Sequence, residues 1–163
     1  MLIERFRELE ERLLFGIKSL YGVRLVSVVV FGSAARGTHG FDSDIDLLII
    51  AKNLPRGRIK RIREFETVED KIDPFLDSLR KKGINTYISA IIKSPEEADR
   101  RSPLFLDMVE DARILFDRED FFSEILERLK KRLKQLGAKR IWRGDTWYWD
   151  LKPDYKAGDV FEI

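Results

Sequence analysis

The sequence predicts a single α/β (α+β) domain, in which a short β-sheet is flanked by helices. Three observations support this fold class. A length of 163 residues suits one ordinary domain with a small appendage. Between Leu2 and Leu20, apolar residues recur mostly every three or four positions, as on an amphipathic helix. Beyond it, apolar runs of strand length alternate with charged segments of helix length.

The first helix should end at Gly22, because a glycine readily closes a helix. Val23–Phe31 is apolar at nearly every position and rich in β-branched residues, which predicts a central strand covered on both faces. A polar loop follows. The second strand should run from about Asp44 to Ala51 and end at the turn Asn53–Pro55.

The charged segment Arg56–Lys82 is expected to be mostly helical. Pro74 should break this helix or begin a new one, because proline lacks the amide hydrogen that a helix interior uses. Gly83 closes the segment. Ile84–Ile92 then has the apolar, β-branched character of a third strand.

Local signals mark the later elements. Ser94–Glu97 combines a capping residue, a proline at the first helical position and a glutamate in reach of a capping box, so it should begin a helix. Pro103 should open a second short helix, and Ala112–Phe116 could form a fourth strand at the sheet edge. Glu119–Leu136 again has amphipathic spacing and stops at Gly137.

The last 26 residues contain all three tryptophans. Arg140–Trp142 and Trp147–Asp150 suggest a hairpin, and residues 153–163 suggest an extended tail that packs back on the domain. The aromatic rings could stack on nucleic-acid bases, or they could close over an exposed edge or apolar surface. We therefore predict a main domain, residues 1–118, and an appendage of helix, hairpin and tail, residues 119–163.

Composition excludes several classes of protein. The chain has no cysteine, which rules out disulfides, thiolate nucleophiles and zinc sites with thiolate ligands. The N-terminus lacks the apolar core of a signal peptide, and no apolar run approaches the roughly 18 residues that span a bilayer. We therefore expect a cytoplasmic protein that does not enter the membrane. Charged residues make up 37% of the chain, a bias typical of thermophile proteins.

Two basic runs lie in a chain whose net charge is only +2. Arg56–Arg63 holds five basic residues, and Arg128–Arg143 holds eight without an acidic one. Either run could meet phosphate, but a charge run on a helix is more often a solvated face. Nucleic-acid binding through the second run and the hairpin therefore stays open.

The most informative stretch begins the second strand. Asp44 and Asp46 are two residues apart, so on a strand they share one face, while Ile45, Leu47 and Ile49 point to the core. Two carboxylates at one site repel each other unless a divalent cation bridges them, and Mg²⁺ binds one or two protein carboxylates together with phosphate oxygens and water. The pair therefore predicts a metal site. The alternative is that Asp44 caps the strand end and Asp46 pairs with an arginine.

Phosphate-binding features precede the carboxylate pair. Gly32 lets backbone come close to a bound group, and Ser33 offers a hydroxyl and an amide where the chain turns. Arg36 could add a bidentate contact to the same anion. These three residues are therefore the predicted phosphate-binding set.

Gly32-Ser33, ten intervening residues and Asp44-Ile45-Asp46 together resemble the signature of the DNA polymerase β-like nucleotidyltransferase superfamily. The likeness is greatest to the small prokaryotic members, the minimal nucleotidyltransferases (MNT type). It covers about residues 23–116 in the order of elements and implies the nucleotidyltransferase fold, with a short mixed sheet flanked by helices.

The resemblance also implies an activity. Gly32, Ser33 and Arg36 would bind ATP or another NTP, and Asp44 and Asp46 would be catalytic residues that bind Mg²⁺. A nucleotidyl group, AMP in the small members, would pass to an acceptor hydroxyl while pyrophosphate leaves. Small members often act as antitoxins that adenylylate a HEPN-type toxin, so such a toxin is a candidate protein partner.

One feature of that family is missing from the chain. Its members use a third carboxylate from a later strand, but the predicted third strand contains no acidic residue. Asn85 is nearest in character, with Thr86 and Ser89 as weaker substitutes, while Asp73 and Asp77 are expected on a helix surface. A second hypothesis therefore stays open: the protein could bind nucleotide and metal without transferring a nucleotidyl group.

Other kinds of site find no support. His39 is the only histidine, is expected at the surface, and cannot form a metal site or a Ser/His/Asp triad alone. Neither a GxxxxGK[ST] loop nor a GxGxxG motif is present.

Overall fold

Four strands form one sheet in the computed structural model, which describes all of residues 1–163. They are β1 (Leu25–Phe31), β2 (Ile45–Ala51), β3 (Ile88–Lys93) and β4 (Arg113–Asp117). The order is β3-β2-β1-β4, in which β1 pairs antiparallel with β2 and β4, whereas β2 and β3 run parallel. The α/β class and the short mixed sheet are therefore confirmed, and β1 is an inner strand as predicted.

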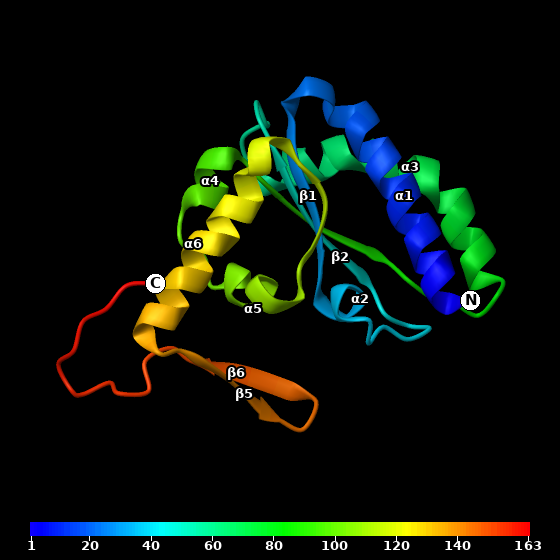
Figure 1. Ribbon diagram of the computed structural model, residues 1–163. Helices are drawn as coiled ribbons and strands as arrows, with labels where there is room; N and C mark the ends of the chain where they lie inside the picture. The colour runs from blue at the N-terminus through cyan, green and yellow to red at the C-terminus, as the bar shows by residue number, and fades with distance from the viewer.

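Helices cover both faces of this sheet. They are α1 (Leu2–Tyr21), α2 (Gly32–Arg36), α3 (Arg58–Arg80), α4 (Pro95–Asp99), α5 (Leu104–Asp111) and α6 (Phe121–Leu136). Figure 1 shows α1 and α3 side by side over one face, with α5 and α6 over the other. None of these helices combines the length and the apolar character that crossing a bilayer requires.

Two hydrophobic clusters, one on each side of the sheet, fill the space beneath these helices. In β2, Leu47 and Ile49 belong to the cluster with α1 and α3, whereas Leu48 and Ile50 belong to the cluster with α5 and α6. All four side chains are fully buried. The strand has a continuous apolar run because helices lie over both of its faces.

The predicted helix boundaries are confirmed where a local signal sets them. Gly22 follows α1 and Gly137 follows α6, both with positive φ. At the start of α4, the Ser94 hydroxyl accepts a hydrogen bond from the Glu97 amide at 3.2 Å. The Glu97 carboxylate in turn accepts one from the Ser94 amide at 2.9 Å, which completes the predicted capping box.

Pro74 neither breaks nor begins a helix, contrary to the prediction. It lies inside the continuous helix α3, whose buried residues include Val68, Ile72 and Leu76 on both sides of the proline. The buried apolar face therefore continues through this position and holds the helix together despite the one hydrogen bond that proline cannot make.

The third strand begins at Ile88 instead of Ile84. The amide of Ile84 donates to the Leu79 carbonyl at the end of α3, at 3.0 Å, and the amide of Asn85 donates to the Phe41 carbonyl at 2.7 Å. These two hydrogen bonds hold the backbone in the connection before β3, where it cannot pair as a strand.

The C-terminal hairpin is confirmed. β5 (Lys139–Arg143) and β6 (Thr146–Asp150) pair antiparallel, with Trp142 opposite Trp147. In Figure 1 the hairpin lies beyond the end of α6 and below α5. The tail returns to α6, where Arg132 donates to the Glu162 carbonyl at 2.5 Å. The division of the chain at residue 118 stays a prediction.

Arg61 and Glu97 join α3 to the capping box of α4. Two hydrogen bonds of 2.7 and 3.0 Å connect the guanidinium and the carboxylate. These bonds lower the pKa of Glu97 from its ordinary value of 4.5 to about 2. Because the folded state holds the charged form, the carboxylate stabilises the fold above pH 4.5 and loses this contribution as the pH falls towards 2.

Glu97→Gln should lower the free energy of unfolding at pH 7 by about 1–2 kcal/mol, a modest value because the pair is partly exposed. The difference from the wild type should shrink between pH 4.5 and pH 2 in urea denaturation. Glu96→Gln is the matched control, because Glu96 lies in the same turn without an ionic partner and should change stability little. If the difference in stability between the wild type and Glu97→Gln stayed constant down to pH 2, the lowered pKa of Glu97 would be contradicted.

Candidate functional site

The carboxylate pair lies where β2 begins, beside the end of β1. Phe31 is the register partner of Asp46, so Gly32, the first residue of α2, lies next to the Asp46 carboxylate. Alternation along β2 places Asp46 on the face of Leu48 and Ile50, opposite the core residues Ile45, Leu47 and Ile49. The aliphatic face of β2 therefore packs in the larger core, as predicted.

Asp46 is half-buried and carries an unfavourable charge. Burial raises the pKa of its carboxyl group, and the negative charge of Asp44 raises it further. The Ser89 hydroxyl and the positive charge of Arg36 act in the opposite direction. Asp44 itself is exposed, and its Oδ1 atom accepts a hydrogen bond from the Tyr87 amide at 3.3 Å. A bound cation would relieve the repulsion between the two carboxylates.

Gly32 is required by the space beside Asp46. Its φ is +71°, in the region that favours glycine, and a Cβ atom there would lie 2.4 Å from Oδ2 of Asp46. Any side chain at position 32 would therefore displace the carboxylate.

The polar loop expected after β1 starts as the short helix α2, which contains both Ser33 and Arg36. Arg36 is near enough to Asp46 to affect its pKa, and its guanidinium makes no hydrogen bond or ion pair with the protein. Instead, its Cζ atom lies 4.5 Å from the centre of the Trp147 ring. The structure thus brings Gly32, Arg36, Asp44 and Asp46 together.

No third carboxylate joins the pair. Ser89 is the register partner of Asp46 on β3, whereas the Asn85 side chain donates to Asp42 at 3.0 Å. Asp73 and Asp77 both pair with Arg80 on the surface of α3. No group of three acidic or histidine side chains is close enough to hold a metal ion by itself. Any metal here would complete its shell with water or with oxygens of a bound ligand.

His39 was expected at the surface, and the structure places it only partly there, because the residue is half-buried. Its ring lies 4.3 Å from the ring of Phe6 on α1, and both ring nitrogens are shielded from solvent without a hydrogen-bond partner. The apolar face of α1 covers it, which the local sequence around the histidine does not reveal.

Sequence reasoning also missed the contact between the hairpin and the site. Trp147 was considered only as a base-stacking or edge-covering residue, yet it touches Arg36 from a position 111 residues later. The spacing of Trp147 and Trp149 does indicate that both rings lie on one face of a strand. Nothing in the pattern indicates which element this face contacts.

A match to a family of known proteins includes the residues of the candidate site. The family model described as "Nucleotidyltransferase domain" matches residues 10–136, from α1 to the last residue of α6. "Putative protein adenylyltransferase MJ1305" of Methanocaldococcus jannaschii is 38% identical over 121 residues, which cover 73% of this chain and 77% of that protein.

Two solved structures show a weaker likeness. A toxin–antitoxin structure with AMP-PNP is 14% identical, with a TM-score of 0.49 over 78% of this chain and 92% of that one. A tri-AMPylated Shewanella oneidensis HEPN toxin in complex with an MNT antitoxin is 12% identical, with a TM-score of 0.48 over 80% of this chain and 87% of the other.

Gly32→Ala should force the Asp46 carboxylate away from its position. Gly37→Ala is a matched control, because Gly37 has a φ of +72° and open space where its Cβ would lie. Both variants should lose about 1–2 kcal/mol of stability from backbone strain. Only Gly32→Ala should also weaken nucleotide binding, at least tenfold by calorimetry, since a displaced carboxylate removes from the site a charged contact worth more than 1.4 kcal/mol. Equal affinities of the two variants would show that the close approach does not matter.

Proposed function

The chain belongs to the nucleotidyltransferase domain family, and we propose that it transfers AMP from ATP to an acceptor hydroxyl with Mg²⁺ held by Asp44 and Asp46. The observation that carries this proposal is the position of the half-buried Asp46 carboxylate, which lies beside the charge of Asp44 and against the Cβ-free face of Gly32. The name of the 38% identical relative supports an adenylyl group and a protein acceptor.

The residues present fit a magnesium ion. Mg²⁺ is commonly held by one or two carboxylates and completes its shell with phosphate oxygens and water. Asp44 and Asp46 supply that number of carboxylates. Burial first and the charge of Asp44 second raise the pKa of Asp46, and a cation would remove the repulsion between the two charges. When bound, the ion would neutralise charge on the triphosphate and on the leaving pyrophosphate.

The other residues of the site would bind and orient the nucleotide. Gly32 turns the chain into α2 beside the Asp46 carboxylate and would present its backbone to the triphosphate, and Ser33 can donate from its hydroxyl. Arg36 has free N–H groups that suit a phosphate oxygen. With the triphosphate held, the acceptor hydroxyl gives up its proton to solvent and its oxygen forms a bond to the α-phosphorus. The bond from that phosphorus to the oxygen that bridges to the β-phosphate breaks, and pyrophosphate leaves.

A protein hydroxyl is the acceptor that we propose. The relative named as a protein adenylyltransferase supports this class of acceptor. A HEPN-type toxin is the first protein to test, because the Gly-Ser and Asp-x-Asp pattern resembles that of small antitoxins.

A nucleotide-binding module without transfer activity is the second candidate. Ser89 is the β3 residue directly opposite Asp46, and a serine hydroxyl is a poor metal-bound base compared with a carboxylate. Such a module would bind Mg·ATP and leave it intact.

Replacing both carboxylates, Asp44→Asn with Asp46→Asn, should weaken Mg·ATP binding by at least about a hundredfold in calorimetry, since two charged contacts are lost. The variant should remain folded, because burial already disfavours the charged form of Asp46. Asp42→Asn is the matched control from the same loop, since Asp42 bonds only to Asn85. If the double variant bound Mg·ATP as well as the wild type does, the metal site would be wrong.

Transfer itself should be visible with radiolabelled ATP. Label in the α-phosphate should appear on the acceptor protein, whereas label in the γ-phosphate should leave with pyrophosphate. Binding without transfer to any acceptor would favour the second candidate. If the wild type did not bind Mg·ATP, salt-dependent binding of nucleic acid through Arg128–Arg143 would become the function to test.

A further inference from the structure

The hairpin has two different faces. Its register pairs Arg140 with Trp149 and Trp142 with Trp147, and directly opposed residues of an antiparallel pair share a face. These four side chains therefore form one face, which we call the tryptophan face. Tyr148 lies on the other face and is substantially exposed. On the tryptophan face, Trp147 and Trp149 are partly buried, whereas Trp142 is exposed.

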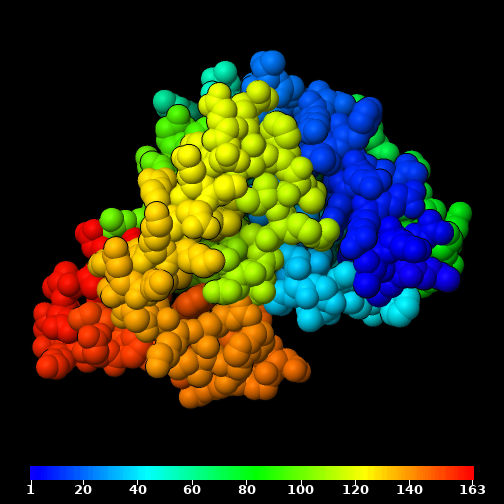
Figure 2. Space-filling view, in the orientation of Figure 1, coloured from blue at the N-terminus to red at the C-terminus, as the bar shows by residue number.

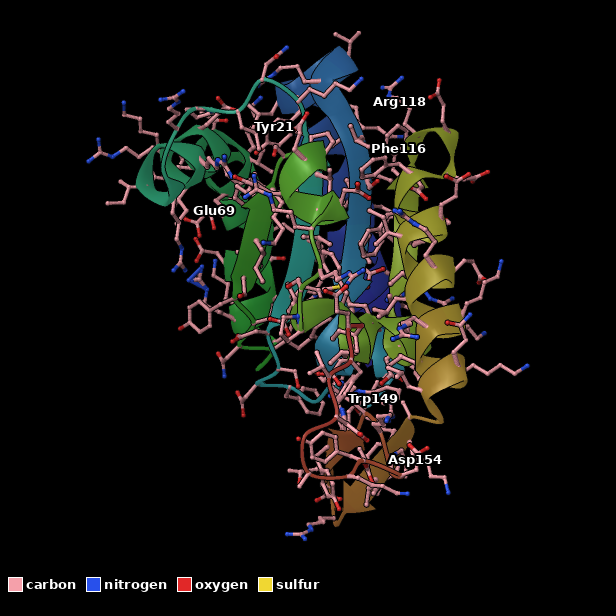
Figure 3. All side chains as sticks on the ribbon, turned by 90° about the vertical axis from the view of Figure 1, so that its left-hand side faces the viewer. Tyr21, Glu69, Phe116, Arg118, Trp149 and Asp154 are labelled. Atoms are coloured by element: carbon pink, nitrogen blue, oxygen red, sulfur yellow. The ribbon has the colours of Figure 1, made fainter.

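Two acidic residues of α5 anchor the tryptophan face. The indole N–H groups of Trp147 and Trp149 both donate to one oxygen of Asp107, at 2.6 and 3.2 Å. One helical turn later, Asp111 forms an ion pair with Arg140 at 2.8 Å, and the side chains of this pair are only 17% and 14% exposed. The hairpin is thus fixed to a helix of the main domain (Figure 2), with Trp149 at the junction (Figure 3).

Two guanidinium groups lie close to the Trp147 ring. The Cζ atom of Arg36 is 4.5 Å from its ring centre, and that of Arg140 is 4.8 Å away. The Trp142 ring packs beside it at a centroid distance of 5.0 Å. These neighbours leave little room for a nucleotide base on Trp147. The ring serves instead as a cation–π partner for Arg36 at the end of α2.

Arg36 is held without being neutralised. None of its N–H groups donates to a protein acceptor, and no carboxylate forms an ion pair with it, although its charge acts on Asp46. A guanidinium held over an aromatic ring through its carbon keeps its N–H groups available to an anion. A free arginine would lose side-chain entropy on binding phosphate, and this contact removes part of that cost in advance.

We propose that Trp147 is a positioning residue that holds Arg36 ready for the triphosphate, so that the C-terminal hairpin is part of the nucleotide site. The hairpin lies beyond residue 136, where the match to the family model ends. The inference rests on the proposed function for the identity of the ligand. It predicts that Trp147 affects the affinity for Mg·ATP and the KM, with kcat nearly unchanged.

The first test compares three variants of the full chain by calorimetry with Mg·ATP. Trp147→Leu removes the aromatic ring and should raise Kd about fivefold, as expected for one partly exposed cation–π contact. Trp147→Phe keeps a ring and should recover most of the affinity. Tyr148→Leu changes the opposite face of the same strand and should leave Kd unchanged. Equal Kd values for Trp147→Leu and the wild type would overturn the inference.

A double-mutant cycle separates positioning from a general structural role. If Trp147 acts through Arg36, adding Trp147→Leu to Arg36→Ala should weaken binding no further. If Trp147→Leu weakened both backgrounds equally, its role would be structural and the inference would fail. The Asp44→Asn/Asp46→Asn variant tests the proposed metal site without changing Trp147 or Arg36, so the two proposals can fail independently. A wild type that did not bind Mg·ATP would overturn both proposals.

A second measurement covers the case in which Trp147→Leu does not fold. In wild-type protein labelled with ¹⁵N-arginine, the Nε–H signal of Arg36 can be identified by its loss in Arg36→Lys. The ring current of Trp147 should displace this signal from the position of a free arginine, and Mg·ATP should shift it again. An Arg36 signal at the free-arginine position, or one that ignores the nucleotide, would overturn the inference.

Discussion

The close approach of Gly32 to Asp46 is the constraint on which the site depends. The register of β1 and β2 sets Phe31 opposite Asp46, so the next residue must pass the carboxylate, and only glycine leaves it room. The positive φ of Gly32 then turns the chain into α2, which contains Ser33 and Arg36. One pairing register therefore places the carboxylates and the proposed phosphate-binding residues at the same end of the sheet.

The parts of the structure that the sequence predicts well depend on local geometry. Alternation along a strand places Asp44 and Asp46 away from the larger core without reference to any other element, and the Ser94–Glu97 capping box closes on itself. The errors arise where tertiary contacts override local preference. α3 continues through Pro74 because its buried face continues, and His39 is half-buried because its ring packs against Phe6. Neither contact has a signal near the residue in question.

The hairpin is likewise predicted in part: local sequence predicts its strands, but its location depends on residues distant in the chain. Its two strands follow from the aromatic residues and the turn between them, and both are present. Its location depends on Asp107 and Asp111, which are one turn apart on α5. This spacing is unremarkable in a chain so rich in charge. The sequence therefore predicts the existence of the hairpin, whereas its contact with Arg36 requires the three-dimensional structure.

The charges of the site suggest that metal and nucleotide bind as one unit. ATP alone would bring its negative charge to two carboxylates, one of which is already destabilised by burial and by its neighbour. Mg²⁺ alone would find two carboxylates and no third acidic ligand. Each therefore supplies what the other lacks, and by linkage each must raise the affinity of the site for the other. Arg36, which forms no ion pair with a protein carboxylate, would add a positive charge that the triphosphate can meet directly.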